Sequence, residues 1–355
     1  MKKEFIDPWG SELPDDYKKT IKSFGLTKFN IKEYPKPNKI MRRGIVIAER
    51  GMKDVKKAIK NKKKFYVLTG FMPSSDKLHL GNKLVIDNVK YFQKQGGDTY
   101  VLIADLESSA TRGIDYESGE KAALDYFIPT FLALGLDKNT KFYFQSKNTE
   151  VTKLAFKLSP KATTNEYKAI YGNANPARVM SSILQVADIL YPQLKEEKPG
   201  VIPVGFDQDP HIRLTRDIAR RQGSFFLPAG LYHKYTPALD GDMKMSKSKK
   251  NYIELPDTDE NIEKRIKTAK TGGRKSLEEQ KKKGGEPEKC MVFELYKQHL
   301  IEDDKELEKI FSQCKKGKLL CGECKKNAIK EMKKFMKDFR DKLNKAKKIK
   351  PNIIK

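Results

Sequence analysis

Residues 64–70 read KFYVLTG, and residues 73–82, which follow closely, read PSSDKLHLGN. The first stretch is a short run of aromatic and β-branched residues that ends at a glycine, which is typical of a buried strand. Apolar residues then recur at helical spacing from about Leu80 to Gln95, so a helix is expected there. A strand, a glycine-containing turn and a helix in this order form the first half of a βαβ unit.

The same alternation continues along the chain. Further strands are expected at residues 98–104, 141–145 and 201–204, and further helices at residues 118–135, 178–190 and 211–221. Strands separated by helices of this length predict an α/β fold with a parallel sheet and right-handed crossovers.

The flanking segments differ from this α/β region. Residues 1–43 are polar with scattered prolines and are interpreted as an N-terminal extension. Residues 44–255 contain the predicted sheet. Residues 256–355 carry amphipathic helical patterns rich in Lys and Glu with no convincing strand, so we expect a separate helical domain there.

The overall charge favours a polyanionic partner. The 355 residues carry a formal net charge of +26, and nucleic acid is the commonest partner for such a surface, although a solvated lysine-rich face is the plain alternative. The N-terminus lacks the apolar core of a signal peptide, and the apolar stretch 126–136 is too short to span a bilayer. We therefore expect a cytoplasmic protein that does not bind a membrane.

The turn after the first strand contains groups suited to binding phosphate. Its glycine and small polar residues allow a phosphate to approach the backbone N–H groups at the helix N-terminus, where the helix dipole favours anions. His79 and Asn82 are three residues apart, so on a helix they share a face and can donate jointly to one phosphate group. The H-x-G-N pattern alone is a weak signal, since His79 could simply begin the helix.

A second cationic stretch, Lys244-Met245-Ser246-Lys247-Ser248, lies near the end of the α/β region. Two lysines flanked by small hydroxyl groups suit the stabilisation of charge on a leaving pyrophosphate. Alone, such a stretch is usually just a basic turn. Its occurrence together with the first motif in one α/β region favours the catalytic interpretation.

Together the two motifs resemble the HIGH and KMSKS signatures of the Rossmann-fold aminoacyl-tRNA synthetases. The second matches letter for letter. The first departs from the usual pattern, because Leu80 replaces isoleucine and Asn82 replaces the final histidine. Asn82 keeps a hydrogen-bond donor and resembles the variant found in tryptophanyl enzymes.

Residues 202–217, IPVGFDQDPHIRLTRD, resemble a signature of tryptophanyl-tRNA synthetases. The likeness has an archaeal character and extends from Asp7-Pro8-Trp9 into the C-terminal helices. It implies a Rossmann-like catalytic domain at residues 44–255, ending in the KMSKS loop, and a helical anticodon-binding domain at residues 256–355. It also implies a homodimer that acts on tRNA(Trp), L-tryptophan and ATP with Mg²⁺.

The resemblance places the amino-acid substrate near a predicted helix. Gln185 and Asp188 share one helical face. In tryptophanyl and tyrosyl enzymes the matching Gln faces the substrate's ammonium group and the matching Asp reads its side chain, with Gln208 helping at the ammonium end. An ionised Asp188 accepts an indole N–H or a phenol O–H, so it does not choose between the two substrates.

Two apolar residues favour tryptophan. Tyrosyl enzymes resemble this chain at the first strand but place a tyrosine at the position of Leu68. Leu68 and Val204 offer no second polar contact, which suits indole because it has one donor and no acceptor. Both residues could also be ordinary strand core. Glu107 is a second candidate acceptor for the indole, although a role in capping the strand end is favoured.

The resemblance also assigns roles in the reaction. It implies that the tryptophan carboxylate attacks the α-phosphorus of ATP, and that the terminal ribose hydroxyl of tRNA then takes up the tryptophanyl group. Charge in the transition state would be stabilised by His79, Asn82, Lys244 and Lys247. The candidates for holding the nucleotide are Gly70, Ser75, Gly81, Gly205, Asp207, Met245, Ser246 and Ser248.

All four cysteines lie in the predicted helical domain, in the pattern C-x(23)-C-x(6)-C-x(2)-C: Cys290, Cys314, Cys321 and Cys324. In a reducing cytoplasm such a set favours metal binding over disulfides, and four thiolates suit either zinc or a [4Fe-4S] cluster. Some tryptophanyl-tRNA synthetases carry an iron–sulfur cluster on a similar C-terminal pattern, so the resemblance implies a [4Fe-4S] cluster, with Zn²⁺ as the alternative. Ordinary packing of small side chains is the third reading.

Two other functions remain open at this point. A tyrosyl-tRNA synthetase would share the framework, although Leu68 and residues 205–217 count against it. A small-molecule nucleotidyltransferase also uses an H-x-G-H-type loop on a Rossmann sheet, but it would need neither the KMSKS stretch nor a basic helical domain.

Overall fold

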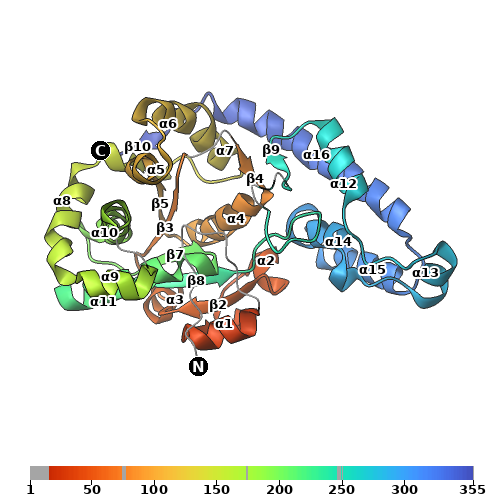
Figure 1. The fold of residues 1–355 in the computed structure, drawn as a ribbon, viewed down its shortest axis with the longest axis horizontal. Helices are drawn as coiled ribbons and strands as arrows, with labels where there is room; N and C mark the ends of the chain where they lie inside the picture. The colour runs from red at the N-terminus through yellow and green to blue at the C-terminus, as the bar shows by residue number, and fades with distance from the viewer. Residues whose placement is uncertain (1–15, 74–76, 173–174, 246–248, 250, 355) are drawn as a thin grey trace.

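The computed structural model describes residues 16–73, 77–172, 175–245, 249 and 251–354. Within them the central feature is an eight-stranded sheet (Figure 1). In spatial order its strands are β1 (Thr27–Lys28), β2 (Val46–Arg50), β8 (Ala229–His233), β7 (Gly200–Val204), β3 (Tyr66–Phe71), β5 (Asp98–Ile103), β6 (Lys141–Phe144) and β10 (Asn352–Ile353). Strand β3 therefore lies near the middle of the sheet.

The middle of the sheet is parallel, as the sequence predicts. Strands β7, β3, β5 and β6 pair in parallel, and β8 and β10 extend this arrangement on either side. The four predicted strands are thus confirmed. Strands β1 and β2 pair antiparallel at the other edge, so the parallel sheet has an antiparallel border.

Helices cover both faces of the sheet (Figure 1). Those in the first two-thirds of the chain are α1 (Tyr17–Ser23), α2 (Lys39–Arg42), α3 (Lys53–Lys60), α4 (Leu80–Lys94), α5 (Asp105–Arg112), α6 (Tyr116–Ala122), α7 (Ile128–Ala133), α8 (Thr149–Leu158), α9 (Thr164–Tyr171), α10 (Pro176–Leu190) and α11 (Asp209–Gln222). The predicted helices at residues 80–95, 178–190 and 211–221 correspond to α4, α10 and α11. The one predicted at 118–135 is broken into α6, a π-helical turn at Ala123–Phe127, and α7.

Alternation along the strands explains the two helical layers. Successive strand side chains point to opposite faces. Val67 and Phe142 therefore join the core beneath α4 and α7, whereas Leu68 and Tyr143 join a second core beneath α8, α10 and α11. Leu68 thus points toward the layer that carries Asp188.

The C-terminal part is helical, as expected, and it runs along one side of the sheet domain (Figure 1). Its helices are α12 (Asp259–Thr268), α13 (Leu277–Lys283), α14 (Met291–Leu295), α15 (Asp304–Lys315) and the long α16 (Cys321–Ala346), with a π-helical turn at Tyr296–Leu300 after α14. Among the described residues, no helix combines the length and apolar character needed to cross a membrane.

The expectation that no strand lies beyond Pro256 is wrong. Strand β10 follows α16 and pairs in parallel with β6, with Asn352 opposite Lys141. The backbone N–H of Ile354 adds a hydrogen bond of 2.8 Å to the carbonyl of Phe142. The short sequence Asn352-Ile353-Ile354 thus returns to the sheet edge after a helical region of about a hundred residues, a pairing that local sequence pattern cannot reveal.

Two short strands next to the first motif form a separate small sheet. Strand β4 (Leu78–His79) pairs antiparallel with β9 (Glu254–Leu255). The hydroxyl of Tyr126 accepts a hydrogen bond from the N–H of Leu78 (2.7 Å) and donates one to the carbonyl of Leu255 (2.5 Å). This pairing places the residues just after the second motif beside the first motif.

Candidate active site

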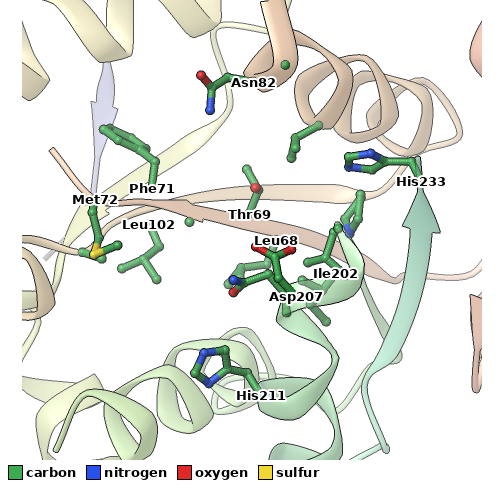
Figure 2. Close-up of a pocket in the computed structure, with 18 of the residues that line it drawn as sticks. Leu68, Thr69, Phe71, Met72, Asn82, Leu102, Ile202, Asp207, His211 and His233 are labelled. Carbon is green, nitrogen blue, oxygen red and sulfur yellow. The ribbon is translucent and has the colours of Figure 1, made fainter. Parts of the chain in front are cut away.

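A cavity of about 390 Å³ opens at the carboxyl ends of β3 and β7, where ligands of parallel sheets bind (Figure 2). Most of the predicted site residues line it. They are Leu68, Gly70, His79, Gly81, Asn82, Gln185, Asp188, Val204, Gly205, Asp207, Gln208, Lys244 and Met245. Ser75, Ser246, Lys247 and Ser248 lie outside the described residues, and the structure says nothing about them.

His79 and Asn82 form the N-terminal cap of α4 and not simply a pair on one helical face. The N–H of Gly81 donates to His79 Nδ1 (3.0 Å), and the N–H of His79 donates to Asn82 Oδ1 (3.0 Å). Because Nδ1 of His79 is an acceptor, the proton of a neutral ring is on Nε2. The polar groups of both side chains, the His79 ring with its Nε2–H and the Asn82 amide, line the cavity.

Two glycines allow the backbone to pass close to these groups. A Cβ atom on Gly81 would lie 2.8 Å from the His79 ring, and one on Gly205 would lie 2.6 Å from Asp207 Oδ1. Real side chains do not tolerate such distances. Both positions require glycine if the histidine and the aspartate are to keep their orientations.

Asp207 is held by the hydroxyl of Tyr235. That hydroxyl donates to Asp207 Oδ1 (2.9 Å) and accepts from the N–H of Asp207 (3.1 Å). Lys244 Nζ lies over the Tyr235 ring, 5.5 Å from its centroid, and the N–H of Met245 donates to the carbonyl of Thr236 (2.9 Å). The start of the second motif is thus fixed against the loop after β8.

Asp188 is fully buried at the opposite end of the cavity. Its carboxylate accepts hydrogen bonds from the hydroxyl of Tyr143 (3.1 Å) and from Gln145 Nε2 (2.7 Å). Burial raises the pKa of Asp188 to about 8, the charges of Glu107 and Asp105 act in the same direction, and the two hydrogen bonds oppose the shift. The carboxylate has been removed from water and oriented by two donors.

Glu107 and Gln185 form a second polar pair in the cavity. Gln185 Nε2 donates to both carboxylate oxygens of Glu107 (2.7 and 2.8 Å). Glu107 lies in the first turn of α5, and its N–H donates to Gln145 Oε1 (3.3 Å). Gln145 therefore links this pair to Asp188. The carboxylate of Glu107, for which strand-end capping is the favoured expectation, contacts Gln185 in the cavity.

His211 also lines the cavity, on α11 below the sheet in the view of Figure 2. The hydroxyl of Tyr171 lies 2.8 Å from His211 Nδ1. Burial lowers the pKa of His211 to about 3, so the imidazole is neutral at pH 7. A neutral ring adds polarity to this wall without adding charge.

Sequence reasoning missed Tyr143 and Gln145, although a signal for them exists. Both lie at the end of the predicted strand 141–145, two residues apart, so they share one face of the sheet. Polar groups at the carboxyl end of a parallel strand are candidates for a binding site. Their contact with Asp188, more than forty residues away, requires the tertiary structure.

The four cysteines lie in one region of the helical part, with Cys290 buried before α14 and the others on α15 and α16. Burial raises the pKa of Cys324 to about 12, and the three other thiols add to the shift. Within the described chain, however, no three His, Cys, Asp or Glu side chains are grouped as a metal ion would need. The thiols are neighbours, but their side chains as placed do not form a ligand set.

Glycines leave room around two of these thiols. A Cβ atom on Gly273 would lie 2.9 Å from Cys321 Sγ, and one on Gly285 would lie 2.8 Å from Cys314 Sγ. Gln280 Nε2 also donates to Cys321 Sγ (3.3 Å). The donor set of four thiols suits a soft metal or a cluster, provided that the side chains turn toward a common point.

A parallel sheet with this cavity and these two motifs defines a class I tRNA synthetase. The family model described as "tRNA synthetases class I (W and Y)" matches residues 60–337 of the chain. The chain is 42% identical to a tryptophan–tRNA ligase of Methanocaldococcus jannaschii (100% of this chain, 99% of the relative) and 41% identical to that of Hyperthermus butylicus (96% and 95%). The tryptophanyl-tRNA synthetase structure from Aeropyrum pernix K1 superposes with a TM-score of 0.89 at 41% identity, covering 97% of each chain. The chain belongs to the tryptophan–tRNA ligase family.

The buried state of Asp188 predicts a pH dependence of stability. Its pKa is raised above that of an unfolded aspartate, about 3.9, so between about pH 4 and pH 8 the folded chain holds a proton that the unfolded chain has lost. The free energy of unfolding therefore falls as pH rises through this window. Asp188→Asn, which cannot ionise, is expected to lose less stability between about pH 5 and pH 8 than the wild type. Urea unfolding at both pH values tests this, and equal losses in the two proteins would contradict it.

Proposed function

We propose that the protein activates L-tryptophan with Mg-ATP and transfers the tryptophanyl group to tRNA(Trp). The observation that carries the proposal is the layout of the one cavity described above. His79, Asn82 and Lys244 line one end of the cavity. The carboxyl group of Asp188 lies at the other end, oriented by its hydrogen bonds and close to the apolar side chains of Leu68 and Val204. Family membership supports the same reaction.

The end with Asp188 would take the indole ring. The indole N–H donates to a carboxyl oxygen of Asp188, which Tyr143 and Gln145 hold in place. Leu68, which is 2% exposed, and Val204 form apolar walls with no acceptor for a phenol hydroxyl. A site matched to one donor discriminates strongly against a substrate with different polar groups.

The middle of the cavity would bind the ammonium and carboxylate of the amino acid. Glu107 supplies a negative charge 3% exposed to solvent, and Gln185 orients it. This pairing favours Glu107 as the ammonium partner in place of the indole acceptor considered from the sequence. Gln208, at the start of α11, lines the same space and would assist.

The end with His79 and Asn82 would bind the triphosphate. In the first step the tryptophan carboxylate oxygen forms a bond to the α-phosphorus, and the bond to the bridging oxygen of the leaving pyrophosphate breaks. His79 Nε2–H, the Asn82 amide and Lys244 donate to phosphate oxygens as their charge increases, and Lys247 would join them. Gly70, Gly81, Gly205, Asp207 and Met245, with Ser75, Ser246 and Ser248, are the proposed nucleotide contacts.

In the second step the oxygen of the terminal ribose hydroxyl of tRNA bonds to the carbonyl carbon of tryptophanyl-adenylate, and the bond from that carbon to the AMP oxygen breaks. AMP leaves with the bonding electron pair, and the hydroxyl proton passes to the leaving phosphate or to water. No side chain becomes covalently attached to the substrate in either step. The protein contributes positioning and preorganised donors, which is sufficient for chemistry at phosphorus.

The test of this function is ATP–pyrophosphate exchange measured with each of the twenty amino acids. We expect exchange with tryptophan alone. Exchange with tyrosine would preserve the class and overturn the assignment of the apolar wall at Leu68. Absence of exchange with every amino acid, in protein that is folded by circular dichroism, would overturn the proposal.

We further propose that Cys290, Cys314, Cys321 and Cys324 hold a [4Fe-4S] cluster, with Zn²⁺ as the alternative. The number of thiols, their common region and the glycines beside them support this. Such a group would supply structural stability to the helical part and takes no part in either step. Protein purified without oxygen is expected to contain iron and acid-labile sulfide in equal amounts, both lost in Cys321→Ser. Zinc without sulfide would support the alternative, and absence of both metals would contradict the proposal.

Several other predictions from the resemblance remain proposals. They are the division into segments 1–43, 44–255 and 256–355, the binding of the tRNA anticodon by the last of these, the homodimer, and the location in the cytoplasm. Light scattering would test the dimer, and tRNA protection from nucleases in the presence of the protein would test the RNA contact.

A further inference from the structure

The helical part of the chain reaches the wall of the active-site cavity at Thr236. This residue follows β8, lines the cavity and is 4% exposed. Its hydroxyl contacts two side chains of the π-helical turn Tyr296–Leu300, which belongs to the helical part. Residues about sixty positions apart are thereby joined inside the protein.

Thr236 contacts both Gln298 and His299 through hydrogen bonds of its hydroxyl group. Thr236 Oγ1 donates to Gln298 Oε1 (2.9 Å) and lies 3.3 Å from His299 Nε2. Gln298 is oriented in turn, because its Nε2 donates to Glu294 Oε2 (2.8 Å). Both Gln298 and His299 are almost completely buried, at 1% and 2% exposure.

The protonation of His299 is consistent with this arrangement. Burial lowers its pKa, and the positive charges of Lys83 and Lys39 lower it further, so the ring is neutral. Its Nδ1 is buried with no hydrogen-bond partner among the described atoms. The proton therefore belongs on Nε2, where it is donated to the Thr236 hydroxyl while that hydroxyl donates to Gln298.

The turn that carries Gln298 and His299 is itself anchored to α2 and to Arg43, the residue that follows it. Arg43 donates to the carbonyls of Lys297 (2.8 Å) and Ile301 (2.7 Å), and Lys39 donates to the carbonyl of His299 (3.2 Å). Carbonyl groups on both sides of Gln298 are therefore held by cationic side chains. These bonds hold the backbone of the turn that carries the two side chains facing Thr236.

On its other side Thr236 holds the second motif. Its carbonyl accepts the N–H of Met245 (2.9 Å), and Met245 is 3% exposed. The preceding residue, Lys244, lies over the ring of Tyr235, which precedes Thr236. The position of Thr236 thus fixes where the backbone enters the second motif and where its first cation stands.

We propose that Gln298 and His299 are positioning residues that act through Thr236 to place Met245 and Lys244 for phosphate chemistry. The inference rests on the proposed function, because it assumes that Lys244 serves the leaving pyrophosphate. Neither Gln298 nor His299 lines the cavity. Their effect should therefore appear in the rate of adenylate formation and leave tryptophan binding unchanged.

The first test replaces the hydroxyl alone. Thr236→Val, which keeps the shape but removes both hydrogen bonds, is expected to lower kcat of tryptophan-dependent exchange about tenfold, as expected for the loss of one to two buried hydrogen bonds. The KM for tryptophan should stay within about twofold. Thr236→Ser restores the hydroxyl and should restore kcat. Equal losses in the Val and Ser variants would overturn the proposal.

The second test uses a residue outside the cavity. Gln298→Leu removes the acceptor for Thr236 and should lower kcat by a similar factor without raising the KM for tryptophan. The double variant Thr236→Val/Gln298→Leu should be no slower than the slower single variant, because both changes break the same link. Fully additive losses, or a kcat of Gln298→Leu equal to that of the wild type, would overturn the proposal.

The wild-type reaction separates this inference from the function it rests on. If the wild type exchanges with tryptophan and the variants match it, only the inference fails. If the wild type exchanges with no amino acid, the proposed function fails and the inference fails with it. The thermal unfolding midpoint of each variant is measured in parallel. If the Thr236→Val and Thr236→Ser variants both lose kcat in proportion to the fall in their unfolding midpoints, Thr236 has a structural role only.

Discussion

Asp188→Ala is expected to lower kcat/KM for tryptophan by at least about a hundredfold. The change removes the proposed acceptor for the indole N–H and leaves Tyr143 and Gln145 without the carboxyl group that they now contact. An unsatisfied buried polar group costs about 1–3 kcal/mol, and a buried hydrogen bond contributes about 0.5–1.5 kcal/mol. Steady-state exchange kinetics with tryptophan, followed by competition against phenylalanine, measure the effect.

A buried carboxylate nearby offers a matched control. Asp105 is 3% exposed and accepts a hydrogen bond from the N–H of Ser146 (3.1 Å), but it does not line the cavity. Asp105→Ala should therefore lower the unfolding midpoint and keep the preference for tryptophan over phenylalanine. If Asp188→Ala kept that preference as well, Asp188 would not read the indole ring.

Lys244→Ala is expected to lower kcat of adenylate formation by about a hundredfold to a thousandfold, with little change in tryptophan affinity. Removal of one preorganised group that stabilises transition-state charge typically has an effect of this size. Lys244 lies at the cavity wall, over the Tyr235 ring and close to the proposed position of the leaving pyrophosphate. Single-turnover measurement of adenylate, with tryptophan affinity measured separately, distinguishes chemistry from binding.

Lys249 provides the control for loss of charge in the same loop. Its ammonium is 2.7 Å from a carboxylate oxygen of Asp242, and its side chain is 64% exposed. Lys249→Ala removes one positive charge without changing the cavity, so kcat should stay within about twofold of the wild type. Equal losses of kcat and of tryptophan affinity in Lys244→Ala would show that Lys244 contributes to ground-state binding instead.

The sequence predicts the centre of the fold better than its edges. Residues 64–69 and 98–104 are dense in apolar and β-branched residues because β3 and β5 are buried on both faces. Strand β2, with the sequence VIAER, carries Glu49 and Arg50, and β8 begins with Ala229 and Gly230. Neither sequence has the composition of a buried strand. The pairing of β2 with β8 could therefore be identified only from the structure.

In the candidate site, too, local sequence predicts some residues and not the distant ones that contact them. His79, Asn82 and Lys244 lie in short motifs whose residue types suit phosphate chemistry. The spacing of Asp188 and Gln185 places them on one helical face, and the resemblance to tryptophanyl and tyrosyl enzymes implies the role of Asp188. The groups that orient these residues come from distant segments. Tyr143 reaches Asp188 from β6, Gln145 reaches it from the turn after β6, and Gln298 reaches Thr236 from the helical part. Such contacts depend on how the elements pack, and no local pattern encodes that packing.

Strand β10 has a mechanical consequence for the helical part. The chain leaves the sheet after β8 and returns to it at β10, which pairs with β6, the strand that contains Tyr143 and precedes Gln145. The intervening helices are therefore attached to the sheet at both ends, through β8 before α12 and through β10 after α16. After a protease cut between α12 and α16, the C-terminal fragment would still have α16 packed on α7 and β10 paired with β6. The helical part is thus linked to the end of the cavity beside Asp188 through β6, and to the end beside Lys244 through Thr236.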